Sequence, residues 1–174
     1  MTKKEFKNLV LYEVYDNRKM FVLRRVWKRF CDSSKDAVFL IRKYQYLSHK
    51  HSNIRAIFAR NKLVRKYGIF ISANTTIGKG LVLPHPNGIV FGKCVSIGEN
   101  CRIFQQVTIG SKNNDDSLKG NQPVIGDNCT LFAGAKIIGN ISLSSGTNVG
   151  ANSVLMQNTE ENSVYAGVPA RKIK

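Results

Sequence analysis

Aliphatic residues recur at every sixth position through the second half of the chain. The spacing holds without a break from Ile125 to Leu155, and it runs upstream from Ile97 to Ile109 in another phase. The complete set is Ile97, Ile103, Ile109, Ile125, Leu131, Ile137, Leu143, Val149 and Leu155. A period of six suits a short strand followed by a corner, with the aliphatic side chain pointing inward. Three hexapeptides close one triangular coil, so stacked coils around a continuous apolar column are predicted.

The first part of the chain is patterned as helix. Residues 3–66 contain neither glycine nor proline, so nothing in the sequence forces a helix to end there. Apolar residues repeat at three- and four-residue spacing, in one stripe of Val22, Val26 and Phe30 and another of Leu40, Tyr44 and Leu47. Breaks followed by new helix starts are expected at 32–34 and 48–53. We expect three or four helices with basic faces.

Charge and glycine divide the chain at the same place. Of the formal net charge of +16, residues 1–66 carry +13, from 18 basic and five acidic residues. All 14 glycines and all four prolines fall at or after Gly68. We therefore predict a basic α-helical segment over 1–66 and a β domain over 67–174. The basic helices are either a solvated surface or a surface for anionic partners such as lipid headgroups. Nucleic acid is not expected as a partner, because no nucleic-acid-binding motif accompanies the charge.

Several other classes are disfavoured. No apolar run approaches the roughly 18–20 residues of a membrane span, and no apolar stretch of a secretory signal follows the first charged residues. A cytoplasmic protein is expected, with possible peripheral association at the inner membrane face. The four cysteines show no C-x-x-C spacing, so we expect reduced thiols and no metal site.

Four motifs carry a resemblance to a known family. They are Ile-Gly-Lys-Gly-Leu-Val-Leu-Pro-His-Pro-Asn-Gly-Ile-Val at 77–90, Gln-Gln-Val-Thr-Ile-Gly at 105–110, Ala-Gly-Ala-Lys-Ile-Ile-Gly-Asn at 133–140 and Ala-Gly-Val-Pro-Ala-Arg at 166–171. Residues 65–174 resemble the hexapeptide-repeat acyltransferases, in the branch of serine acetyltransferases and capsule or O-antigen O-acetyltransferases. The resemblance implies a mainly β fold, a left-handed parallel β-helix, preceded here by the small basic helical segment. It also implies a homotrimer that uses acetyl-CoA.

His85 is the candidate catalytic residue. It is the only histidine of the repeat region, it stands between Pro84 and Pro86, and it interrupts the period, since Ile77 and Ile97 are twenty residues apart. Imidazole is the side chain best suited to act as a general base near neutral pH. The matching histidine of the family removes the proton of the acceptor. A structural histidine held by two prolines is the alternative interpretation.

The other candidate site residues follow from acyl transfer to a hydroxyl group. Backbone N–H groups at Gly110 or Ser111 are candidates to stabilise the oxyanion. The polar stretch 111–122 is predicted to be a loop beside the cleft for coenzyme A, and 156–174 a C-terminal tail. The predicted coenzyme contacts are Ser111, Lys112, Ala133, Lys136, Ala151, Arg171 and Lys174. The predicted acceptor contacts are Asn87 and Gln122.

Two positions depart from the serine acetyltransferases. The resemblance places Phe70 where those enzymes carry an aspartate that pairs with the catalytic histidine, and Gln122 where they carry a second histidine. We therefore predict an acetyl-CoA-dependent O-acetyltransferase acting on a sugar hydroxyl of a surface-polysaccharide precursor. The alternatives are a serine O-acetyltransferase of cysteine biosynthesis and a non-catalytic β-helical scaffold. A metal hydratase of the same fold is excluded, because one histidine in the repeat region cannot supply three metal ligands.

Overall fold

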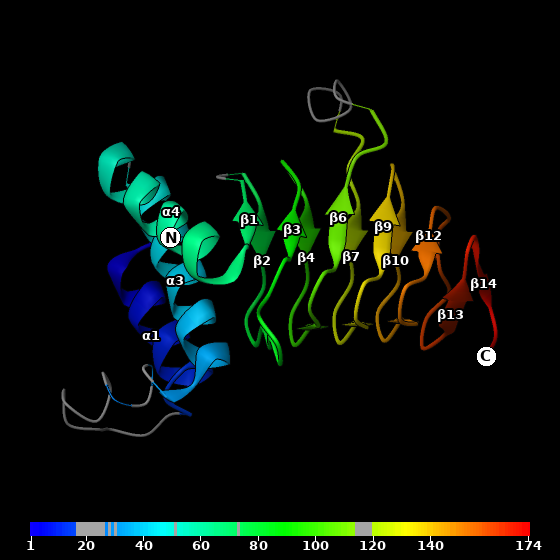
Figure 1. Cartoon of the computed structure of the whole chain (residues 1–174), viewed down its shortest axis with the longest axis horizontal. Coiled ribbons are helices and arrows are strands. Elements are labelled where there is room, and N and C mark those ends of the chain that lie inside the picture. The colour runs from blue at the N-terminus through cyan, green and yellow to red at the C-terminus, as the bar shows by residue number, and fades with distance from the viewer. Residues whose placement is uncertain (17–26, 28, 30, 51, 73, 114–119) are drawn as a thin grey trace.

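A group of helices packs against one end of a three-sided prism of short strands (Figure 1). The computed structural model describes residues 1–16, 27, 29, 31–50, 52–72, 74–113 and 120–174. The helices are α1 (Lys3–Glu13), α3 (Ser33–His49) and α4 (Asn53–Tyr67). None of the described helices is long and apolar enough to cross a membrane.

The helix boundaries have local causes. The Asp32 side chain accepts a hydrogen bond from the backbone N–H of Lys35 at 3.1 Å, which caps α3 at the predicted break. α4 ends at Gly68, whose φ of 61° favours glycine and turns the chain into the first strand. The predicted stripe of Leu40, Tyr44 and Leu47 is buried. The stripe of Val22, Val26 and Phe30 lies outside the described residues.

The strands form three sheets, one for each side of the prism. The first contains β1 (Phe70–Ile71), β3 (Val90–Phe91), β6 (Thr108–Gly110), β9 (Lys136–Ile138) and β12 (Val154–Leu155). The second contains β2 (Thr76–Ile77), β4 (Ser96–Ile97), β7 (Val124–Ile125) and β10 (Ser142–Leu143). The third contains β5 (Arg102–Ile103), β8 (Thr130–Leu131), β11 (Asn148–Val149), β13 (Val164–Gly167) and β14 (Ala170–Lys172). All neighbouring strands are parallel except β13 and β14, which are antiparallel.

The aliphatic residues that recur at every sixth position line the inside of the prism. Each of the nine aliphatic residues that define it is at most 3% exposed, and the residues four positions later are also buried, except after Ile109, where the chain enters the long loop. In-register partners such as Ile109 and Ile137 stack on one another in successive coils. The predicted apolar column is confirmed, and its burial is the main favourable contribution to the fold of this domain.

Coil length varies at two corners. Val90 pairs with Thr108, 18 residues later, whereas Val82 pairs with Arg102 after 20 residues. The two additional residues therefore lie between Val82 and Val90, at the corner that carries His85. The coil containing 111–122 is longer by ten residues, since Ile109 pairs with Ile137. Residues 114–119 of that predicted loop are outside the described part of the chain.

A buried ion pair joins the helices to the prism. Arg42 of α3 contacts Glu13 of α1 at 2.6 Å, with side-chain exposures of 1% and 0%. The Glu13 carboxylate also accepts hydrogen bonds from the backbone N–H groups of Gly80 and Leu81. The Arg42 guanidinium donates to the carbonyl oxygens of Ile77 and Gly78. Because both charges bond backbone groups of the first coil, they fix the helices on the end of the β domain.

Candidate active site

His85 lies on the edge of the prism where each coil passes from the third sheet to the first. The following coils place Phe104 and Phe132 at the same edge. The rings of His85 and Phe104 are 6.2 Å apart between centroids, and those of Phe104 and Phe132 are stacked at 5.3 Å. An aromatic row therefore runs along this edge and holds one side of the imidazole.

The backbone around His85 is fixed from both sides. The Asn87 N–H donates to the carbonyl of His85 at 2.8 Å, and the Gly88 N–H donates to the carbonyl of Tyr67 at the end of α4. The two flanking prolines restrict the backbone further. The His85 side chain is exposed, and no hydrogen bond or ion pair joins it to another described residue. The imidazole is thus held by its backbone and Phe104, with its nitrogens available to a substrate.

Some predicted coenzyme residues share this edge. Ala133 and Ala151 occupy it in successive coils, where the Asn152 N–H donates to the carbonyl of Ala133 at 2.8 Å. The Lys136 ammonium donates to the carbonyls of Gln106 and Gly134 at the same corner. Small side chains beside a cation leave room for an extended ligand with phosphate groups. These assignments remain predictions.

The other predicted residues lie elsewhere in the chain. Gly110 ends β6, and Ser111 and Lys112 follow it, so they lie at the opposite edge of the first sheet from His85. A Cβ atom at Gly110 would have no neighbour within 4 Å, which leaves its backbone approachable. Arg171, in β14, and Lys174 are exposed at the end of the prism farthest from the helices (Figure 1). One chain therefore does not bring all the predicted residues together.

The two predicted acceptor residues differ in position. Asn87 is exposed two residues from His85. Gln122 is only 3% exposed and precedes β7, between the first and second sheets. Within one chain, Asn87 accompanies His85 and Gln122 does not. Both roles remain predictions.

A cavity of about 410 Å³ adjoins His85 and was not foreseen from the sequence. His85, Pro86 and Asn87 form one wall, and the end of α4 and the start of α3 form the other. The lining residues that sequence reasoning missed are Ser33, Arg65, Lys66, Tyr67 and Gly68. Arg65 and Lys66 are adjacent bases in the last turn of α4, separated from the capping Gly68 by Tyr67, and this was the one sequence signal that could have pointed to them.

Asp36 supports the helical wall of this cavity from behind. Its carboxylate accepts hydrogen bonds from Lys66 at 2.8 Å, from Arg29 at 2.7 Å and from the Tyr67 hydroxyl at 3.0 Å. Burial alone would raise the pKa of Asp36, but the hydrogen bonds from Lys66, Arg29 and Tyr67 outweigh it and hold the pKa below its ordinary value. The hydrogen bond between Lys66 and Asp36 also raises the pKa of Lys66. Both groups are therefore charged near neutral pH.

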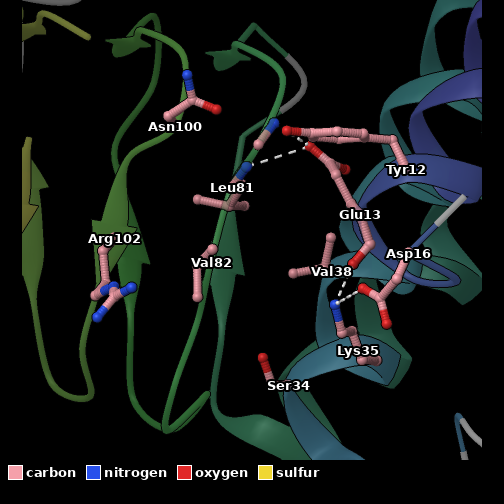
Figure 2. A pocket seen from close by; sticks show the side chains of 11 residues that line it. Tyr12, Glu13, Asp16, Ser34, Lys35, Val38, Leu81, Val82, Asn100 and Arg102 are labelled. Carbon is pink, nitrogen blue, oxygen red and sulfur yellow. Dashed lines mark hydrogen bonds and ion pairs between the residues drawn. The ribbon is translucent and has the colours of Figure 1, made fainter. Parts of the chain in front are cut away.

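A second cavity, of about 540 Å³, lies between the helices and the first coils (Figure 2). The Lys35 ammonium donates there to the carbonyl of Glu13 at 2.8 Å and to the carboxylate of Asp16 at 2.9 Å. Arg102 extends from β5 on the opposite wall. None of the predicted site residues lines this cavity, so the chemistry is assigned to the edge that carries His85.

Comparisons with known proteins agree with this architecture. No family model matches the chain. The serine acetyltransferase of Staphylococcus aureus strain Mu50 is 37% identical over 135 residues, which are 78% of this chain and 62% of that protein. A serine acetyltransferase solved in complex with CoA is 30% identical, with a TM-score of 0.70 over 79% of this chain and 57% of that one. The Neisseria gonorrhoeae serine acetyltransferase solved with serine is 26% identical, with a TM-score of 0.82 over 99% and 70%.

These similarities support the predicted resemblance to the hexapeptide-repeat acyltransferases. Within this family it is similar to the serine acetyltransferase branch, and the predicted left-handed parallel β-helix with preceding helices is confirmed. The chain spans about 62% of the length of the curated relatives it matches.

The prediction of a polysaccharide acceptor is wrong. The similar hexapeptide-repeat acyltransferases are serine acetyltransferases, which favours the serine alternative. The prediction rested on Phe70 and Gln122. Phe70 lines a separate cavity with Tyr44 and Phe91, and Gln122 is buried at another corner. Because neither side chain lines the cavity beside His85 within the chain, their identities do not exclude serine there.

Proposed function

We propose that the protein transfers an acetyl group from acetyl-CoA to the hydroxyl group of L-serine. The observation that carries the proposal is the exposed His85 at the edge of the β-helix, beside a cavity of about 410 Å³ that suits a small acceptor. The similarity to serine acetyltransferases over 135 residues supports the same chemistry.

The proposed reaction begins at the imidazole of His85. A ring nitrogen accepts the proton of the serine hydroxyl while the oxygen bonds to the thioester carbonyl carbon. Backbone N–H groups at Gly110 or Ser111 stabilise the resulting oxyanion. Collapse of this intermediate breaks the carbon–sulfur bond, and the thiolate takes the proton from the imidazolium. The products are O-acetylserine and CoA.

We propose that the active protein is a homotrimer. His85 and Gly110 lie at opposite edges of the first sheet, so a neighbouring copy is needed to place both at one reaction centre. Residues 111–113 would then adjoin the His85 edge of the next subunit. Light scattering tests this assembly. A stable monomer with full activity would contradict the intersubunit site.

Thiol release from acetyl-CoA in the presence of L-serine tests the activity. His85→Ala should lower kcat by about 10²–10⁴-fold, the usual contribution of a general base. His49→Ala, which changes an exposed histidine of α3, is the matched control and should retain activity. Absence of both turnover and acetyl-CoA binding in the unaltered protein would favour the non-catalytic scaffold.

We propose in addition that α4 associates with anionic membrane surfaces. Ile54, Ile57 and Phe58 are 50–72% exposed on one side of this helix. Arg55 and Lys62 flank them, and α4 contains no acidic residue. An apolar stripe between cations suits a surface of anionic lipid, whereas a second copy with the same positive charge would be repelled.

Co-sedimentation with vesicles tests the membrane contact. We expect binding to phosphatidylglycerol vesicles and none to phosphatidylcholine vesicles. Phe58→Ser should weaken binding roughly tenfold, because burial of a phenylalanine contributes about 1.5–3 kcal/mol. Val168→Ser, at an equally exposed apolar residue remote from the helices, is the control. Equal binding to both vesicle types would contradict the proposal.

A further inference from the structure

We infer that a cavity between α3 and α4 binds the phosphate group of an anionic phospholipid. The inference goes beyond acetyl transfer and rests on the membrane contact proposed for α4. It deepens that contact, because it replaces a diffuse attraction to charged lipid by a defined site for one headgroup. None of the residues named in the proposed reaction lines this cavity.

The cavity has a volume of about 660 Å³, comparable with that of small-molecule sites. Arg55, Phe58 and Lys62 follow one another along α4 at three- and four-residue spacing, so they share one face of the helix and line one wall. Phe39 and Lys43, four residues apart on α3, line the other wall. Buried aliphatic side chains of both helices complete the lining. The cavity is therefore apolar at its base and cationic on both walls.

Three cations of this cavity are available to a ligand. Lys43, Arg55 and Lys62 are exposed, and no hydrogen bond or ion pair joins any of them to another described residue. A phosphate group offers several oxygen acceptors, and its hydrogen bonds with ammonium and guanidinium groups are strengthened by charge. Cations contributed by two helices can therefore contact one phosphate group.

A fourth cation, Arg29, is already held in place. Its Nε and Nη2 atoms both donate to one carboxylate oxygen of Asp36, at 3.1 and 2.7 Å, and its Cζ atom lies 3.5 Å from the centre of the Phe39 ring. Nη1 makes no hydrogen bond to another described residue, so its N–H groups remain available. Because this guanidinium is fixed before binding, it adds a donor at little further loss of side-chain freedom.

None of the acidic residues of the helical segment lines the cavity. Residues 1–66 contain five acidic residues, and all five are among the described residues. The positive charge of the cavity is therefore not cancelled from within this segment, and it favours an anion. The contacts of the five are those of Glu5 with the start of α1, Glu13 with Arg42, Asp16 with Lys35, Asp32 with the start of α3, and Asp36 with Arg29, Lys66 and Tyr67.

The apolar stripe of α4 distinguishes a lipid from a free phosphate ion. Phe58 belongs both to the wall of the cavity and to the exposed stripe that it forms with Ile54 and Ile57. A ligand whose phosphate lies among the cations can place an attached acyl chain along these side chains. A free phosphate ion would leave the stripe in water. The continuity of the cavity with the stripe therefore favours a phosphate diester that carries acyl chains.

Short-chain lipids below their micelle-forming concentration test this site without a membrane surface. Isothermal titration calorimetry compares dihexanoylphosphatidylglycerol, dihexanoylphosphatidylcholine and inorganic phosphate. We expect the phosphatidylglycerol to bind at least about tenfold more tightly than either of the others, because the phosphatidylcholine brings a cation toward the basic cavity and inorganic phosphate lacks the apolar contact. Inorganic phosphate binding as tightly as the lipid would identify a site for a simple anion and overturn the inference.

Variants assign the binding to the cavity. Arg55→Gln and Lys62→Gln should each weaken the binding of dihexanoylphosphatidylglycerol about tenfold, as expected for the loss of a charge-assisted hydrogen bond. The matched control is Arg60→Gln, which removes the same charge from an exposed position of α4 outside this cavity and should change the affinity less than about twofold. Thermal unfolding checks that each variant folds, which we expect because the altered side chains are exposed.

The outcomes distinguish failure of this inference from failure of the proposed membrane contact. If phosphatidylglycerol vesicles are bound but the short-chain lipid is not, or if Arg55→Gln and Arg60→Gln weaken its binding equally, the inference is overturned and the membrane contact stands. If the unaltered protein does not bind phosphatidylglycerol vesicles, both are overturned. The proposed acetyl transfer is tested separately by thiol release.

Discussion

The carboxylate of Asp36 and the ammonium of Lys66 form an ion pair of 2.8 Å that ties the start of α3 to the end of α4. Tyr67, the last residue of α4, donates its hydroxyl to the same carboxylate. Lys66 and Tyr67 also line the cavity beside His85. The stability of the helical layer and the shape of the proposed acceptor site therefore depend on one buried carboxylate.

Asp36→Asn should lower the free energy of unfolding at neutral pH by about 1.5–3 kcal/mol, because it weakens charge-assisted hydrogen bonds. The pKa of Asp36 is lower in the folded chain than its unfolded value of about 3.9. Its contribution is therefore complete above about pH 4 and is lost as the pH falls through the lower folded value. Urea unfolding at pH 7 and at pH 3 measures this effect. The loss in free energy of unfolding caused by Asp36→Asn should be smaller at pH 3 than at pH 7. Glu161→Gln, at an exposed position, should show neither effect.

Glu13→Gln should destabilise the protein by about 3–5 kcal/mol, because it leaves the Arg42 charge buried without its partner. Urea unfolding at neutral pH measures the change. The exposed capping residue Glu5 of α1 provides the comparison, and Glu5→Gln should lower the free energy of unfolding by no more than about 1 kcal/mol. Equal losses for the two variants would show that the buried pair does not hold the helices on the prism.

Phe104→Ala should lower kcat for acetyl transfer about tenfold with a smaller change in KM. The ring of Phe104 limits where the His85 imidazole can lie, and a small displacement of a general base is costly to the rate. Steady-state kinetics with L-serine separates the effect of the substitution on kcat from its effect on KM. Phe132→Ala, one coil farther from His85, removes an equal ring as control and should reduce kcat less. A rise in KM with kcat unchanged would instead assign Phe104 to substrate binding.

Ile137→Ala should lower the free energy of unfolding by about 2–5 kcal/mol, since it opens a cavity in the fully buried column. Ile138 is the next residue of β9 and points outward, where it is half-exposed. Ile138→Ala should therefore change the free energy of unfolding by less than about 1 kcal/mol. Similar losses at both residues would contradict the assignment of inside and outside.

The β domain was predictable because its period repeats. Nine aliphatic residues at one spacing identify the buried column, and the interruption around His85 locates the lengthened corner. The docking of the helices was not predictable. Glu13, Arg42 and Gly78 are far apart in sequence, and a segment with 18 basic residues gives no sign of which arginine is buried.

In the candidate site, too, only the residues of a local motif were predictable from the sequence. His85 and Asn87 share one corner, as a local motif requires, whereas Arg65 reaches the cavity through the packing of α4. The burial of Gln122 likewise depends on how the chain returns from the loop to β7. Local spacing carries no information about these contacts.

The antiparallel strand β14 closes one edge of the third sheet. A stack of parallel strands offers an unpaired edge at its last coil, onto which another molecule could add strands and extend a fibre. In the third sheet, β14 occupies the edge of β13 through the pairs of Tyr165 with Lys172 and Ala166 with Arg171. The new outer edge carries two exposed cations, which repel a like-charged molecule. The helices cover the other end of the β-helix. Both ends are therefore protected against the addition of strands from another molecule, and this opposes end-to-end aggregation.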